Sequence, residues 1–168
     1  MDERENNRSL FAEALAVGLV GAATVAIWFF VIDLIRGDPF LTPGILGSAV
    51  FLGISSPHQA VINFSTVGLY TLLHGAIFFL VGVGVTALVR AADRRPSFLG
   101  LIIPLAAVLE VLFVGGVAMV AQFLLGAVAW WAVLGGNLLA SLLMGSLLLH
   151  WHPSVTEEET AAEAFSPS

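Results

Sequence analysis

Three polar side chains in long apolar runs are the residues best suited to chemistry: His74, Glu110 and Asn137. Glu110 is the one charged residue between Arg95 and Glu157. An imidazole, a carboxyl group and an amide brought together can relay a proton or bind an ion or polar substrate. The same groups can instead form interhelical hydrogen bonds that fix how helices pack. We favour this structural interpretation and keep the functional one open.

Other chemistry is poorly supported by the residues present. The chain has no Cys, so thiolate metal sites and Cys nucleophiles are ruled out. His58 beside Pro57 is typical of a solvated loop. His150 and His152 are two positions apart, so on a helix they point away from each other and make poor joint ligands. We therefore predict no catalytic residues, no metal and no cofactor.

The composition requires an apolar environment around the elements that carry these residues. Of 168 residues, 58% are hydrophobic and 11% are charged, with a mean hydropathy of +0.98. Soluble domains carry roughly 25% charged residues. The net charge of −6 offers no basic face for nucleic acid. The absence of Lys and the wealth of Ala, Gly, Val and Leu are typical of a high-GC bacterial genome. The sequence thus predicts a bacterial integral membrane protein whose first partner is the lipid bilayer.

Hydropathy predicts an all-α fold, a bundle of four transmembrane helices within residues 9–152. We expect spans over about 9–35, 61–90, 98–123 and 128–151. The first is too long for a signal-peptide core and its flank mixes acids with bases, so we expect it to be retained. Residues 1–8 form an N-terminal tail, and the acidic stretch 153–168 is predicted to be disordered.

The connection after the first span contains its own helix signal. Gly37-Asp38-Pro39 ends the first span, and Thr42-Pro43 is typical of a helix start. The apolar run over 43–53 is too short to span, so we predict an interfacial or re-entrant helix. Asp33 and Arg36 are expected to form an ion pair at the membrane interface.

Arginine positions predict the orientation. Four spans place the N-terminus and the 90–97 loop on one side, where five of the six basic residues lie: Arg4, Arg8, Arg90, Arg94 and Arg95. The positive-inside rule then puts both termini in the cytoplasm of a bacterium, with the protein in the inner membrane. Trp130 and Trp131 would anchor the outer boundary and Trp151 the inner one.

Two further patterns concern packing. Ala14, Gly18, Ala22 and Ala26 recur at every fourth position, which indicates either a close-packing helix face or general Ala and Gly richness. At ~1.5 Å per residue, His74, Glu110 and Asn137 fall ~12, ~16 and ~14 Å below the outer boundary. We therefore hypothesise that these three form one buried polar cluster.

Four short segments resemble a group of uncharacterised small bacterial four-helix membrane proteins: DPFLTP (38–43), YTLLHG (70–75), GNLLA (136–140) and HWHP (150–153). The resemblance covers most of residues 10–153. It implies a four-helix membrane protein and carries over no activity and no catalytic residues.

Three classes of function are open. The first is a non-enzymatic accessory or scaffold subunit that binds a membrane-protein partner or a second copy of itself, which the small-residue faces and the shortage of polar groups favour. The second is a small oligomeric transporter or channel component that uses the His/Glu/Asn cluster. The third is a membrane-embedded enzyme, for which His74 and Glu110 are the only candidates.

Overall fold

The computed structural model describes residues 10–94, 108, 111, 115 and 130–153, and every element in these residues is helical. The elements are α1 (Leu10–Ile35), α2 (Leu41–Leu52), the short 3-10 helix η1 (Pro57–Gln59), α3 (Phe64–Arg94) and α6 (Trp130–Trp151).

Three of these helices are long and apolar enough to cross a membrane: Leu10–Ile35, Phe64–Ala92 and Trp131–Trp151. At ~1.5 Å per residue even the shortest matches a hydrocarbon core of ~30 Å. The spans expected over 9–35, 61–90 and 128–151 are confirmed as helices of this kind. The span expected over 98–123 lies, except for residues 108, 111 and 115, outside the described residues and stays a prediction.

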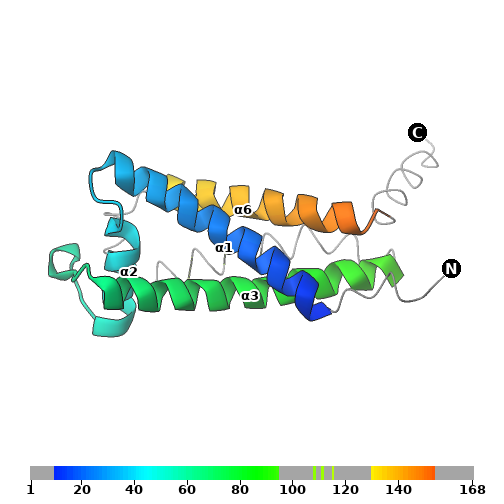
Figure 1. Ribbon diagram of the computed structural model, residues 1–168, viewed down its shortest axis with the longest axis horizontal. Helices are drawn as coiled ribbons and strands as arrows, with labels where there is room; N and C mark the ends of the chain where they lie inside the picture. The colour runs from blue at the N-terminus through cyan, green and yellow to red at the C-terminus, as the bar shows by residue number, and fades with distance from the viewer. Residues whose placement is uncertain (1–9, 95–107, 109–110, 112–114, 116–129, 154–168) are drawn as a thin grey trace.

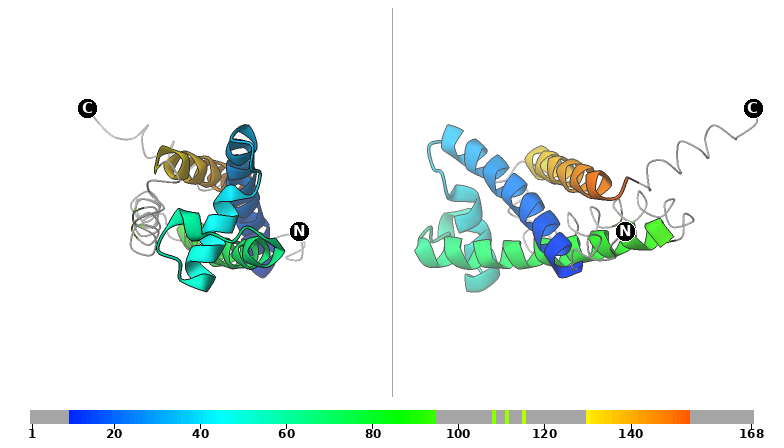
Figure 2. Two further views of the ribbon diagram at one scale, coloured as in Figure 1. Left: turned by 90° about the vertical axis from the view of Figure 1, so that its left-hand side faces the viewer. Right: turned by 45° about the vertical axis from the view of Figure 1, so that its right-hand side comes forward.

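Helix α1 is the centre of the described bundle, because it packs against both α3 and α6. Helix α1 crosses α3 obliquely, and α6 runs beside α1 (Figure 1). Helix α2 lies transverse to α3, at the end of the bundle where α3 begins (Figures 1 and 2). The beginning of α1 and the ends of α3 and α6 therefore meet at the opposite end.

Small residues make the α1–α3 crossing close. Ala14 is fully buried, and a Cβ atom added to Gly18 would lie 2.7 Å from the Phe78 carbonyl oxygen. A Cβ on Gly82 would collide with the backbone of Ala14 and Gly18. The packing face predicted on the first span is thus confirmed at Ala14 and Gly18, whereas Ala26 is exposed.

The outer surface of the bundle is apolar. Among many examples, Leu72 is 72% exposed and Leu80 is 67% exposed on α3, and Leu19 is 60% exposed on α1. Such residues would be costly in water at this density, whereas they match hydrocarbon. The bundle therefore has the surface of a membrane protein.

The turn after α1 has an identifiable chemical basis. Gly37 adopts a φ of 87°, the amide of Asp38 donates to the carbonyl of Asp33, and the amide of Gly37 donates to that of Leu34. This is a Schellman motif, which needs a residue that tolerates positive φ at the Gly37 position. It reverses the chain and delivers α2 back against the end of α1.

Helix α3 begins with a capping box. The amide of Thr66 donates to Asn63 Oδ1 at 2.9 Å, and the amide of Asn63 donates to Thr66 Oγ1 at 3.2 Å. Ser48 of α2 joins the same region, since its hydroxyl donates to the Val61 carbonyl at 3.1 Å and accepts from the Val61 amide at 3.0 Å. These bonds fix α2 against the start of α3.

Candidate functional site

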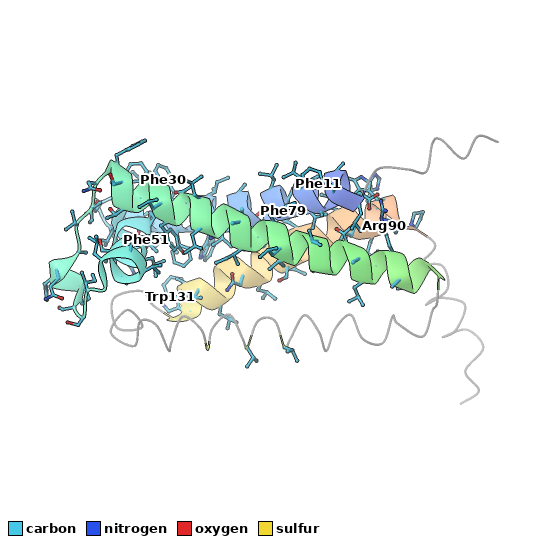
Figure 3. All side chains as sticks on the ribbon, turned by 90° about the horizontal axis from the view of Figure 1, so that it is seen from below. Phe11, Phe30, Phe51, Phe79, Arg90 and Trp131 are labelled. Atoms are coloured by element: carbon cyan, nitrogen blue, oxygen red, sulfur yellow. The ribbon has the colours of Figure 1, made fainter. Side chains whose placement is uncertain are left out.

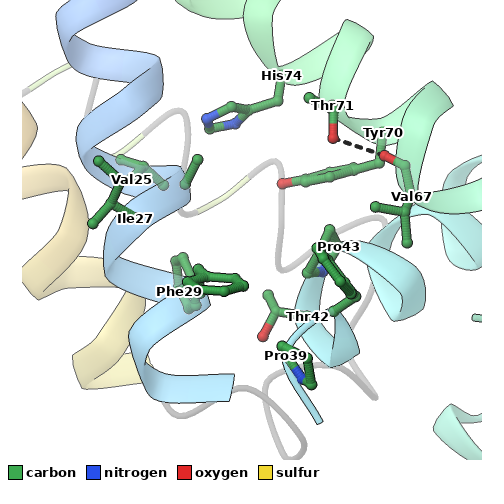
Figure 4. A pocket seen from close by; sticks show the side chains of 13 residues that line it. Val25, Ile27, Phe29, Pro39, Thr42, Pro43, Val67, Tyr70, Thr71 and His74 are labelled. Atoms are coloured by element: carbon green, nitrogen blue, oxygen red, sulfur yellow. Dashed lines mark hydrogen bonds between the residues drawn. The ribbon is translucent and has the colours of Figure 1, made fainter. Parts of the chain in front are cut away.

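A cavity of about 310 Å³ lies where α1, α2 and α3 meet. Helix α1 contributes Phe29, α2 contributes Pro43, and α3 contributes Tyr70 and His74 (Figure 4). None of the described residues that line it is Asp, Glu, Lys or Arg. The site is therefore an apolar chamber with few polar groups, which is the usual composition of a small-molecule pocket.

His74 lies on the face of α3 that packs against α1. Thr66, Tyr70, His74, Phe78 and Gly82 recur at every fourth position and form that face, as helical geometry requires. His74 is 9% exposed, and its Nε2 lies 3.2 Å from the carbonyl oxygen of Ala22. Because a carbonyl oxygen only accepts, Nε2 is the donor and ties α3 to α1.

Aromatic neighbours hold the His74 ring on both sides. The Tyr70 ring stacks on it with centroids 5.9 Å apart, and the Phe78 ring lies at 4.8 Å. Tyr70 extends from α3 across the cavity toward α1, with its hydroxyl at the far end (Figure 4). Within the described part of the chain this hydroxyl makes no hydrogen bond.

The predicted cluster of His74, Glu110 and Asn137 is not assembled by the described residues. Asn137 on α6 is 7% exposed, and its Nδ2 has no hydrogen-bond partner among the described residues. His74 is bonded to α1, and no hydrogen bond joins it to Asn137 within the described ranges. Glu110 lies outside the described residues, so its membership stays a prediction.

The Asp33 carboxylate binds α2 and does not pair with Arg36, contrary to the sequence expectation. Asp33 is fully buried, and its two oxygens lie 2.7 Å from the Thr42 amide nitrogen and 2.7 Å from the Thr42 hydroxyl. Arg36 is exposed, and no ion pair between the two forms in the described part of the chain. The physical reason is that free amides at a helix N-terminus attract a carboxylate strongly.

The sequence did not predict a second set of interacting polar residues, which is centred on Glu13. Glu13 of α1 is 6% exposed, and its Oε2 lies 2.9 Å from Nε of Arg90 on α3 and 3.4 Å from Nε2 of His152 just after α6. We call these three residues the end cluster. Figure 3 shows Arg90 at the end of the bundle away from Phe30 and Phe51. The end cluster joins the three long helices of the described residues at one point.

No match to this chain was found among family models, curated proteins or solved structures. The resemblance to small bacterial four-helix membrane proteins therefore stays a prediction. The site has to be interpreted from its own geometry.

Of the predicted anchors, Trp131 is 52% exposed, as a residue facing the bilayer would be. Trp151 is half-buried and packs against the core residues, and the side chain of Trp130 is outside the described ones. Trp28, which the sequence did not single out, donates from Nε1 to the Ala132 carbonyl at 2.8 Å. Its ring covers Gly136, where a Cβ atom would lie 2.8 Å away.

Proposed function

We propose that this chain is a non-enzymatic subunit of a membrane assembly, an accessory or scaffold protein. The observation that carries the proposal is that buried polar side chains form hydrogen bonds between the helices. Trp28 holds α6 to α1, His74 holds α3 to α1, and Asp33 holds α2 to α1. In each case the hydrogen bond of the polar group holds another helix in place, as expected of a structural protein in lipid.

The end cluster supports the same role. Glu13 accepts from Arg90 and lies next to His152, so the ion pair closes the bundle at the level where its helices leave the apolar zone. We propose that this end faces the cytoplasm of a bacterium and that both termini lie there, in keeping with the distribution of Arg. The assembly would be one of the inner membrane.

Extraction of the tagged full-length protein from its native membrane in a mild detergent tests the proposal. The expected result is a partner membrane protein present in a fixed stoichiometric ratio, measured by native mass spectrometry. A Trp28→Phe variant, which weakens the contact between α1 and α6, should retain less of the partner than the wild type, whereas Trp131→Phe on the exposed face of α6 should retain as much as the wild type. Purification of the chain alone, as a monomer, would contradict the scaffold role.

The cavity beside His74 favours a second candidate, a small oligomeric transporter or channel component. An ionisable residue buried in a membrane protein next to a chamber is a common feature of substrate pathways. A transporter or channel component must move a solute across the membrane. Reconstituted vesicles should then show solute movement that His74→Ala abolishes, and vesicles without such movement for any tested ion or metabolite would leave the scaffold role as the better account.

A further inference from the structure

The α1–α2–α3 cavity has the size of a site for one small ring. At about 310 Å³ it lies at the low end of the range for ligand pockets, ~300–1,000 Å³. A phospholipid head group with its chains is much larger than this space. The cavity therefore suits a single ring and the first atoms of a tail.

The lining of the cavity points to a neutral, flat ligand. Phe29, Phe40 and Tyr70 contribute aromatic rings, and the described residues that line the cavity include no Asp, Glu, Lys or Arg to neutralise a charged ligand. Burying an unpaired charge among these groups would be costly. Aromatic side chains favour ring partners through offset or edge contacts.

One polar group in the cavity, the Tyr70 hydroxyl, adds a preference for a ligand that carries a hydrogen-bond acceptor. The Tyr70 hydroxyl projects into the space without a partner among the described residues (Figure 4). A buried hydroxyl normally finds a partner, because leaving it unpaired costs free energy. A ligand carbonyl oxygen would satisfy it, whereas a hydrocarbon chain would not.

The cavity is bordered on its outer side by residues that face away from the bundle. Ile27 is 63% exposed, Phe30 is 42% exposed and Phe40 is 49% exposed. In a bilayer these residues would contact lipid, so a ligand dissolved in the membrane would reach the chamber between the helices.

We propose that this cavity binds a neutral, lipid-soluble ring compound with a carbonyl acceptor, of the quinone class, through a hydrogen bond from the Tyr70 hydroxyl. The inference goes beyond the scaffold role and does not depend on it. It concerns binding alone and involves no electron transfer.

The test uses the full-length protein in nanodiscs of defined lipid, titrated with a decyl-substituted benzoquinone and compared with empty nanodiscs. We expect saturable binding by calorimetry and a rise in the midpoint of thermal unfolding with quinone concentration. Tyr70→Phe keeps the ring and removes only the donor, so it should weaken the affinity about five- to tenfold. Val67→Phe should fill the chamber and abolish binding.

The matched control is Thr24→Val, which also removes a hydroxyl from a membrane helix. Thr24 donates to the Val20 carbonyl at 2.7 Å and does not line the cavity. The affinity of the Thr24→Val variant for the quinone should therefore equal that of the wild type. If Val67→Phe does not fold, Tyr70→Phe alone decides the question. The proposal is overturned if Tyr70→Phe binds as tightly as the wild type, or if decanol, which has the tail without the ring, stabilises the protein equally.

Discussion

Asp33 acts as the N-terminal cap of a helix that begins eight residues later in the chain. Its carboxylate oxygens lie 2.7 Å from the amide nitrogen and 2.7 Å from the hydroxyl of Thr42, in the first turn of α2. The residue directly before α2, Phe40, provides no side-chain cap. The transverse position of α2, and with it one wall of the cavity, therefore depends on a side chain of α1.

Replacing Asp33 with Ala should lower the free energy of unfolding by ~2–3 kcal/mol, because two hydrogen bonds to a charged group are lost and the Thr42 donors stay buried. Asp33→Asn keeps one acceptor and should cost less. Chemical unfolding in detergent measures both. Asp38→Asn, at an exposed position in the same turn, is the control. Equal stability of Asp33→Ala and the control would show that the cap is unimportant.

A double-mutant cycle should detect coupling between Glu13 and Arg90. Each single change, Glu13→Gln or Arg90→Gln, leaves a partner charge in a mostly buried setting and should destabilise the protein by about 2 kcal/mol. The double variant should be less destabilised than the sum of the two. Arg36→Gln, at an exposed position, should change stability little. Additive effects of the two single changes would mean that the ion pair contributes nothing.

Gly18→Ala should destabilise the α1–α3 contact by ~1–3 kcal/mol, since the new methyl group would lie 2.7 Å from a backbone carbonyl oxygen that cannot easily move. Gly84→Ala is the matched change on α3, where no described residue lies within 4 Å of the added atom. It should be neutral or slightly stabilising through helix propensity. Thermal unfolding of both variants in one detergent makes the comparison. A larger loss in Gly84→Ala than in Gly18→Ala would contradict the crossing described above.

Trp28→Phe should cost about 1 kcal/mol, because it removes the indole donor to Ala132 and leaves most of the ring contact with Gly136. Trp131→Phe makes the same chemical change at an exposed position and should have little effect. The free energies of unfolding of the two variants provide the test. If both lose the same amount, the interhelical hydrogen bond is not a source of stability.

Local sequence patterns predicted the long helices well and the contacts between helices poorly. Apolar runs located α1, α3 and α6, and Gly37 marked the end of α1, because these features act over a few neighbouring residues. The Asp33–Arg36 pair was wrong for a related reason. The i, i+3 spacing permits that pair, but the competing donors of Thr42 come from the next helix and are invisible to local spacing.

The end cluster and the cavity show the same limit for distant residues. Glu13 and Arg90 are 77 positions apart, and Glu13 and His152 are 139 apart, so no short motif links them. The estimated depth in the membrane is similar for His74 and Asn137, but two residues at the same depth can lie on helix faces that do not meet. The direction in which each side chain leaves its helix decides its contacts, and His74 is directed to the backbone of α1.

The end cluster also has a consequence for how the protein is made. Glu13 and Trp28 are translated long before the residues they contact, because His152 lies 139 positions after Glu13 and Ala132 of α6 lies 104 positions after Trp28. Until then the first helix carries a buried-type carboxylate and an indole donor without these partners. A nascent chain halted before α6 would therefore pair Glu13 with Arg90 but lack the His152 contact, and it would carry the Trp28 indole donor without its acceptor, a difference from the finished protein to which membrane chaperones and proteases can respond.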